Sequence, residues 1–297
     1  MGLIKAAVGS VSGTLQDQWK EAIRCEEMGN DVLVVKKTTP TKVISNGSTV
    51  IVGPGQCAII FDNGRIVDAS AEEGFYTFDS SSSPSLFAGD FGGFFKEMWQ
   101  RFTYNGASAK EQAVFFFNTK QIINNLYGTQ APIPFQDWSH PIPNQMTGSM
   151  TPLSVKVRSH GTYVFRITNP FQFMNEVSGM SDVYRTSDIT DQIKSEVLAA
   201  FQNVLNELGN SNHRVPVLEL PSQTDEIKKM MSEKEFDTDI RNRGMAIVGF
   251  NIESVTLDDA SQEKIDKYEL SSNSAMQQGT LVGAYANAVQ DAAKNPN

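Results

Sequence analysis

The clearest pattern of hydrophobic and polar positions lies between residues 147 and 258. Residues 155–167 alternate between apolar and polar side chains, which is the period of a strand with one buried face. From Ile189 to Leu208 the apolar residues recur at helical spacing behind Asp188, and Gly209 follows where that helix should end. We therefore predict a strand followed by a long amphipathic helix.

The same stretch continues with a second helix and a returning strand. Ser222 with Asp225 three residues later fits a capping box, so the second helix is expected to begin there. Its apolar residues fall on two sides, which predicts a kink or packing from two directions. Arg243-Gly244 would end it, and residues 245–257 read as a strand, completing an α/β unit.

Residues 31–79 are predicted to form strands and turns. Asn46-Gly47 and Asn63-Gly64 each separate two apolar runs, and this dipeptide favours the tight turns of β-hairpins. Residues 74–78 read as a further strand, and residues 114–117 are too continuously apolar for a half-exposed one. Gly53-Pro54-Gly55 is interpreted as a turn, and residues 138–143 as a loop between subdomains.

Residues 1–28 have the spacing of an amphipathic helix, although Gly9 and Gly13 weaken it. One interpretation is a stripe packed on the body or on a neighbouring subunit, and the other is a helix lying in a membrane interface. The apolar positions that would make this contact are Leu3, Ile4, Val8, Val11, Leu15 and Trp19.

A second concentration of large apolar side chains, between Leu86 and Tyr104, follows a serine-rich link. So many aromatic groups need a cover, because large exposed apolar patches usually mark contacts. The alternatives are a flap over one end of the β-rich part, a subunit interface, or a membrane-docking loop. The residues assigned to the contact are Phe91, Phe94, Phe95 and Trp99.

Composition limits the classes of function. The net charge of -9 and the pI near 4.9 disfavour binding to nucleic acid, which needs clustered Lys and Arg. Cys25 and Cys57 lie in unlike contexts, so we expect two reduced, buried thiols. The sequence shows neither a secretory signal nor the roughly 20 apolar residues of a membrane span, which predicts a cytoplasmic protein.

The sequence offers no catalytic constellation. His140, His160 and His213 lie far apart and without neighbours at metal-ligand spacing, and no nucleophile elbow or phosphate loop occurs. His160 is interpreted as a solvated residue on the polar strand face, with a hidden hydrolase as the remaining enzymatic alternative. We expect no catalytic residue, cofactor or metal.

Three segments carry a resemblance to a known family: residues 161–170, residues 189–197, and residues 243–255 together with Glu235-Phe236. They resemble the second half of the SPFH domain of stomatin, prohibitin, flotillin and HflK/C, also called Band 7. The chain is most similar to the bacterial virion-core-protein-like branch, the YdjI type. The resemblance extends to about Tyr268 and implies architecture more than chemistry.

The resemblance implies an α+β fold with two subdomains and a helical tail. We expect an N-terminal amphipathic helix at residues 1–28, a β-rich first subdomain at 29–146, an α/β second subdomain at 147–258, and a short helical tail at 259–297. Asp258 and Asp259 place negative charge at the start of the tail, as helix N-termini prefer.

The implied function is a non-enzymatic scaffold of many copies, joined in rings or arcs, that organises membrane patches and recruits proteins. The branch implies a bacterial envelope-stress role with membrane-anchored partners and a PspA-type protein, at the inner face of the cell membrane. The residues expected at the interface between copies are Met230, Phe236, Ile240, Ile265, Tyr268, Leu281 and Tyr285. A structural component of a viral or phage particle is the alternative.

Overall fold

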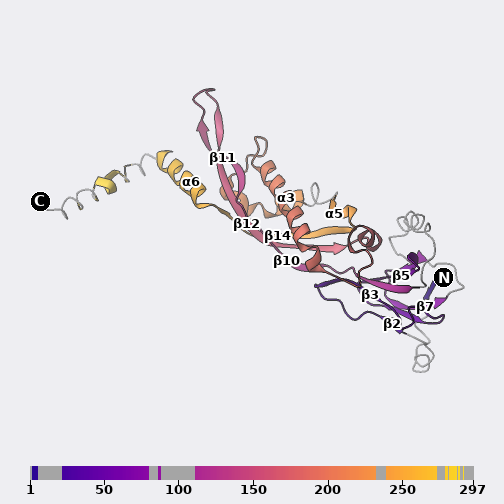
Figure 1. Cartoon of the computed structure of the whole chain (residues 1–297). Helices are drawn as coiled ribbons and strands as arrows, with labels where there is room; N and C mark the ends of the chain where they lie inside the picture. The colour runs from indigo at the N-terminus through magenta and orange to yellow at the C-terminus, as the bar shows by residue number, and fades with distance from the viewer. Residues whose placement is uncertain are drawn as a thin grey trace. The chain divides into compact units, whose positions relative to one another are not determined.

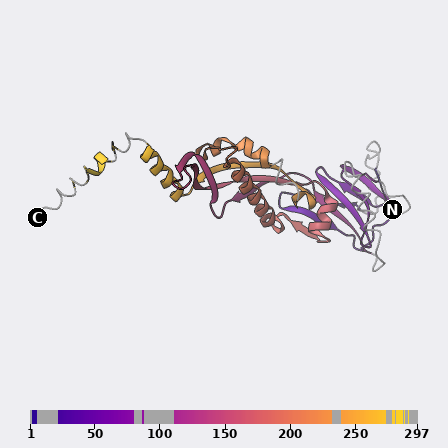
Figure 2. The same ribbon diagram turned by 90° about the horizontal axis from the view of Figure 1, so that it is seen from above.

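The computed structural model describes residues 2–5, 22–79, 86–87, 111–231 and 239–272, with residues 278–279, 281–285, 287 and 290 of the tail. Figures 1 and 2 show the course of the chain. Unit 1 contains Met1–Leu126, Thr162–Val197 and Met231–Phe250, and unit 2 contains Tyr127–Gly161, Leu198–Met230 and Asn251–Asn297. Neither unit is continuous in sequence, so the boundaries expected from the sequence stay a prediction.

A small sheet of unit 1 has the strand order β1-β7-β4-β2. Its strands are β1 (Gly2–Lys5), β2 (Ala22–Arg24), β4 (Thr49–Val52) and β7 (Gly74–Asp79). β7 pairs antiparallel with both β1 and β4, whereas β2 runs parallel to β4. The strand predicted at residues 74–78 is confirmed.

A second sheet of unit 1 has the order β13-β3-β9-β5-β6-β8. Its strands are β3 (Val32–Lys37), β5 (Gln56–Asp62), β6 (Arg65–Ser70), β8 (Leu86–Phe87), β9 (Gln112–Asn118) and β13 (Val183–Arg185). Asn63 and Gly64 turn the chain between β5 and β6 with φ of 52° and 78°, so the predicted Asn-Gly hairpin is confirmed here. β9 is buried along its whole length, as its continuous apolar run predicted.

The core of unit 1 joins side chains from these two sheets. Leu3 and Phe78 come from the first sheet, and Ile60 and Phe116 from the second, and all four belong to one buried cluster. The buried carboxylate of Asp68 accepts a hydrogen bond from Leu3 N–H at 2.5 Å. The apolar cluster therefore fixes the two sheets against each other.

A third sheet has the order β10-β12-β11, with β14 also paired to β12. Its strands are β10 (Ile122–Gly128), β11 (Ile133–Pro143), β12 (Met150–Ile167) and β14 (Met245–Leu257). Every second residue of β12 from Leu153 to Ile167 is buried, which confirms the predicted alternation. The strand predicted at residues 245–257 is confirmed as well.

The longest helix among the described residues, α3 (Thr190–Leu208), covers the predicted span, and Gly209 follows it. Its apolar stripe is buried, and in unit 2 the ring of Phe201 lies 6.0 Å from that of Tyr127. Up to residue 272, the other helices in the described ranges are α2 (Pro170–Phe173), η4 (Met174–Ser178), η5 (Thr186–Asp188), η6 (Val217–Ser222), α4 (Thr224–Met230), α5 (Asp239–Asn242) and α6 (Asp259–Ser272). The expected exit at Gly244 is confirmed by its φ of 74°.

The predicted N-terminal helix is wrong at both of its described ends. Residues 2–5 and 22–24 are strands, because the edges of β7 and β4 pair with their backbone groups. Leu3 and Ile23 are buried in the core of unit 1. Residues 6–21, which include Val8, Val11, Leu15 and Trp19, lie outside the described residues.

The hairpin predicted at Asn46-Gly47 is wrong as well. Residues 43–44 form no strand, and Gly47 N–H donates to the carbonyl of Phe78 at 2.9 Å. Both edges of β4 are already taken by β7 and β2, so no position is left for a hairpin partner.

Two further predictions need correction. Ser222 ends the short helix η6, and its hydroxyl donates to the carbonyl of Glu219 at 2.7 Å, so it does not cap the next helix, which begins at Thr224. Residues 138–143 belong to β11 and not to a loop, because they lie in the β11/β12 hairpin, where Ile142 is opposite Thr151.

Candidate partner-binding surfaces

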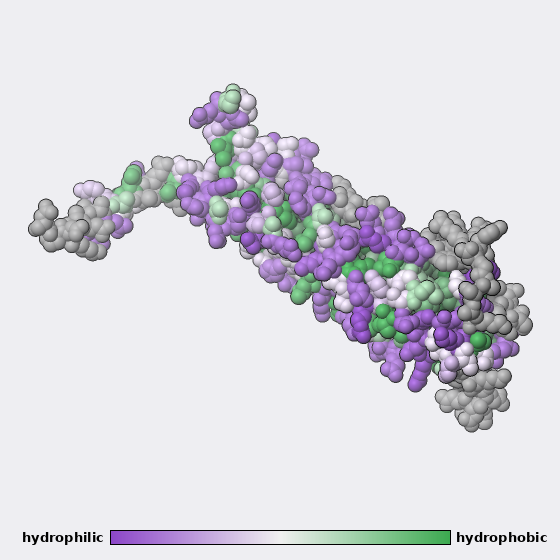
Figure 3. All heavy atoms as spheres, viewed as in Figure 1, coloured by the Kyte–Doolittle hydropathy of each residue, from purple (hydrophilic) through white to green (hydrophobic). Residues whose placement is uncertain are grey.

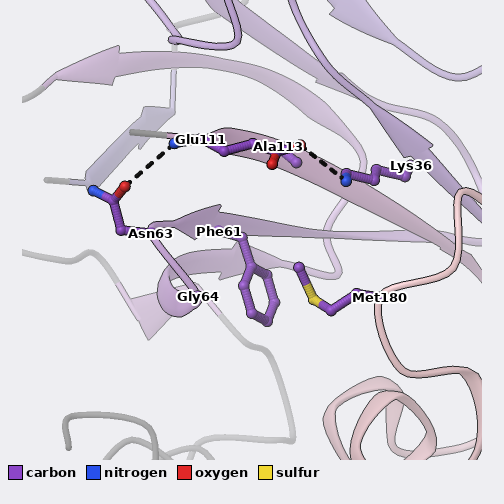
Figure 4. Close-up of a pocket in the computed structure, with 7 residues that line it drawn as sticks. All are labelled: Lys36, Phe61, Asn63, Gly64, Glu111, Ala113 and Met180. Atoms are coloured by element: carbon purple, nitrogen blue, oxygen red, sulfur yellow. Dashed lines mark hydrogen bonds and ion pairs between the residues drawn. The ribbon is translucent and has the colours of Figure 1, made fainter. Parts of the chain in front are cut away.

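A pocket of about 170 Å³ opens in unit 1 beside the turn between β5 and β6. Figure 4 shows its lining, in which Phe61, Ala113 and Met180 form the apolar part and Lys36, Asn63, Gly64 and Glu111 the polar part. Asn63 is fixed there by accepting a hydrogen bond from Glu111 N–H at 3.2 Å. We call this the β5 pocket.

The charged groups at the β5 pocket are Lys36 and its carboxylate partners. Its Nζ lies 3.2 Å from Glu111 Oε1 and 3.7 Å from Asp182 Oδ1, and 5.9 Å from the centre of the Phe115 ring. The hydrogen bond and charge of Lys36 lower the pKa of Glu111. Because the ammonium group already has two carboxylate partners, it is poorly suited to act as a nucleophile. The pocket can hold one small apolar group and offers no reacting group.

A buried polar cluster lies in unit 2, where the pairing of β11 with β12 is irregular between Asp137 and Ile142. The fully buried carboxylate of Asp137 accepts hydrogen bonds from Ser139 Oγ at 2.6 Å and from Val217 N–H at 3.3 Å. Its second oxygen lies 2.5 Å from His140 Nδ1. Sequence reasoning missed this pair, although the two residues are only three positions apart.

The cluster contains Ser, His and Asp but not in a catalytic arrangement. Ser139 Oγ lies 2.9 Å from His140 Nδ1, the same nitrogen that Asp137 binds, whereas a triad needs the serine at Nε2. His140 Nε2 instead faces Glu269 at 3.9 Å, and the imidazole meets the ring of Tyr268 edge-on at 5.1 Å. The cluster therefore ties β11 to η6 and to α6.

An apolar groove of about 310 Å³ lies next to this cluster in unit 2, between η6, the end of β14 and the start of α6, and Val217 belongs to both. Its apolar lining is Val157, Val217, Leu218, Pro221, Val255 and Leu257. Thr256, Asp259 and Gln262 add polar groups. We call this the η6 groove.

The residues predicted to form an interface between copies have different positions. Met230, Ile240 and Ile265 are buried inside the chain, so they have no surface to offer a neighbour and the prediction is corrected for them. Tyr268 is half-buried and its hydroxyl donates to the carbonyl of Pro141 at 3.2 Å. Leu281 and Tyr285 lie exposed on a helical stretch at residues 281–285.

The other predicted contact residues are only partly described. Ile4 belongs to β1, which pairs with β7 and is not helical. Phe91, Phe94, Phe95, Trp99 and Phe236 lie outside the described residues.

The cysteines and histidines show no cofactor chemistry in the described ranges. Both thiols are free; Cys25 is half-buried, and burial raises the pKa of the fully buried Cys57 to about 12. His160 is exposed, with Nε2 4.0 Å from Glu253. Within the same ranges, His, Cys, Asp and Glu side chains form no group of three suited to a metal ion, and none of the helices is long and apolar enough to cross a membrane.

Residues 35–273 match the SPFH domain-Band 7 family, which is most of the chain. The protein therefore belongs to this family, whose members are membrane-associated scaffolds and generally not enzymes. Among curated proteins, the uncharacterized protein YdjI of Bacillus subtilis (strain 168) is similar, with 24% identity over 252 residues. That match covers 85% of this chain and 69% of YdjI. The viral alternative finds no support in either match.

Proposed function

We propose that this protein is an oligomeric scaffold that works at a membrane surface by holding many copies together and recruiting other proteins, without performing a reaction. The observation that carries the proposal is in the tail. Leu281, Val282 and Tyr285 are 70%, 68% and 75% exposed, and none of the described residues covers them. Leu281 and Tyr285 are one helical turn apart and so share a face, which suits contact with the tail of a neighbouring copy.

The sites in both units support binding more than catalysis. The β5 pocket holds a lysine that is already paired, and the Asp137 cluster has its serine at the wrong nitrogen of His140. The η6 groove is largely apolar. Family membership supports the same function.

For location, we propose peripheral attachment to the cytoplasmic face of the cell membrane, directly or through membrane-anchored partners. Phe91, Phe94, Phe95 and Trp99 remain the residues proposed for this contact. The similarity to the YdjI branch suggests an envelope-stress role together with a PspA-type protein.

Sedimentation velocity over a range of protein concentrations tests the assembly. Leu281→Asp and Tyr285→Asp should lower the mass of the assembly, because each places a charge in the apolar contact. Asn287→Asp is the matched control, since it adds the same charge at an exposed polar position of the tail. A wild-type protein that stays a monomer at every concentration, with lipid and cell extract present, would end the proposal.

Vesicle flotation tests attachment to the membrane. The wild type should float with vesicles, and Trp99→Asp should reduce the floating fraction. If the protein floats only with vesicles that carry a membrane-anchored partner, its contact with the membrane is indirect. Capture of a purified PspA-type protein by the immobilised chain tests the partner, and its absence from the captured fraction would remove that partner.

A further inference from the structure

The hairpin formed by β11 and β12 carries three exposed apolar side chains at its uncharged tip. Met146 is 96% exposed at its turn, and Ile142 and Met150 on the two strands are 41% and 57% exposed. Residues 141–151, which we call the hairpin tip, contain no Lys, Arg, Asp or Glu. Figure 1 shows this hairpin standing out from the rest of unit 2.

The turn holds Met146 in a defined position. The side chain of Asn144 accepts hydrogen bonds from the N–H groups of Met146 and Thr147, at 2.9 and 3.3 Å. Asn144 N–H donates to the carbonyl of Ser149 at 2.8 Å, and Gly148 allows the reversal with a φ of 69°. A flexible, polarisable side chain is thus presented to solvent on an ordered turn, at little further cost in backbone entropy on binding.

The η6 groove is an apolar hollow in the same unit. Val157 and Val217 are buried at its floor, and Leu218 on its wall is 56% exposed. The polar groups beside them, on Thr256, Asp259 and Gln262, can pair with amides and hydroxyl groups. Figure 3 shows hydrophobic residues on the stem of the projecting hairpin and a mixture of hydrophilic and moderately hydrophobic residues at its end.

The hairpin tip cannot reach the η6 groove of its own chain. The pairing register puts Ile133 opposite Val157, beside the groove, and Pro143 opposite Met150, at the tip. The groove residue Val217 donates its N–H to Asp137, which is opposite Leu153. Beyond this point the strand extends about 10 Å further, from Leu153 to Met150. The tip and the groove are therefore held apart in each copy.

We propose that the hairpin tip of one copy binds in the η6 groove of the next copy, with Met146 against Leu218. This inference rests on the proposed assembly of many copies. The polarities match: the uncharged tip brings the amides of Asn144 and Gln145 and leaves no charge of its own unpaired in the apolar groove. Since tip and groove are different surfaces, the contact is head-to-tail, and such contacts build rings or open filaments.

Cross-linking between two differently tagged preparations tests the contact. Both carry Cys25→Ser, one also Met146→Cys and the other Leu218→Cys; buried Cys57 stays in place. A short bis-maleimide should join the two tagged chains when they are mixed. Met146→Cys mixed with Ile123→Cys is the matched control, because Ile123 is another exposed apolar residue outside the groove. A yield for the Leu218 pair no higher than for this control overturns the inference.

Charge substitution gives a second measurement. Met146→Asp should weaken self-association about tenfold or more, whereas Leu126→Asp, at another exposed apolar site, should not. If the wild type assembles and Met146→Asp assembles equally well, the hairpin contact is overturned but the proposed scaffold function stands. If the wild type is a monomer, both the contact and the scaffold function are overturned. Loss of vesicle flotation by Met146→Asp with unchanged assembly would assign the tip to lipid and overturn the contact.

Discussion

Asp137 and Tyr163 are both buried polar residues, but within the described ranges only the side chain of Asp137 has hydrogen-bond partners. Asp137 accepts hydrogen bonds from Ser139 and Val217 and pairs with His140. The hydroxyl of Tyr163 has no partner among the described residues, and burial, with a smaller effect of the Asp191 charge, raises its pKa from 10.0 to about 12. The carboxylate of Asp137 therefore stabilises the fold through its hydrogen bonds, whereas the hydroxyl of Tyr163 contributes no hydrogen bond to it.

We expect Tyr163→Phe to leave the free energy of unfolding at pH 7 within about 1 kcal/mol of wild type, because no partner loses a hydrogen bond. The raised pKa stabilises the fold fully below pH 10, and this contribution is lost as the pH rises from 10 toward about 12. Tyr163→Phe should therefore lose less stability in that interval. Urea unfolding at several pH values measures this. The control is Tyr285→Phe, at an exposed tyrosine. If the two variants lose stability equally between pH 10 and about 12, the loss cannot be attributed to Tyr163.

Asp137→Ala should destabilise the protein by about 2 to 4 kcal/mol, since it leaves Val217 N–H and His140 without their buried acceptor. The control is Asp182→Ala, whose side chain is 86% exposed, and it should change stability by less than about 0.5 kcal/mol. Denaturant unfolding compares the two. Equal midpoints would show that the Asp137 cluster has no structural role.

At the scale of elements, local signals identified those whose partners are also local. The alternation of β12, the stripe of α3 and the Asn63-Gly64 turn could all be predicted, because each depends on residues within a few positions. Asn46-Gly47 has the same local signal, yet its strand pairs with β7, which lies further along the chain. The residues of a turn alone do not show which other strands pair with the two edges of the strand that follows it.

Two features could not be predicted because they depend on distant partners. β1 is a strand because β7 and Asp68 supply its hydrogen bonds, although residues 1–28 have helical spacing. The pair Asp137 and His140 meets where the register of β11 shifts, and a regular strand would place residues three apart on opposite faces. Of the candidate surfaces, only the exposed tail was predicted; the hairpin tip and the η6 groove need the register and the packing of η6.

The contact between β12 and β14 leaves no room for a side chain at Gly161. A Cβ there would lie 2.0 Å from the backbone oxygen of Asn251. Gly161→Ala should therefore lower the free energy of unfolding by about 2 kcal/mol or more, because backbone must move. The control is Gly279→Ala, because a Cβ at this position of a helical stretch meets nothing within 4 Å, and the change should be neutral or slightly stabilising. Thermal unfolding compares the two variants. Similar losses in the two would contradict the steric argument.

At the scale of the whole molecule, the net charge of -9 opposes the joining of copies. Salt shortens the reach of this repulsion, from about 10 Å at 0.1 M to about 3 Å at 1 M, and leaves apolar contacts in place. We expect the sedimenting assembly to grow as sodium chloride is raised. Dissociation in salt would instead assign the contacts between copies to ion pairs.

The β11/β12 hairpin gives any such assembly a direction. Each copy would hold its forward neighbour by a projection and its rear neighbour by a hollow, so an open arc has two unlike ends. Copies with a blunted projection could still receive a neighbour but could not extend toward the next. A small admixture of them would stop growth at one end, and arc length would fall with their proportion.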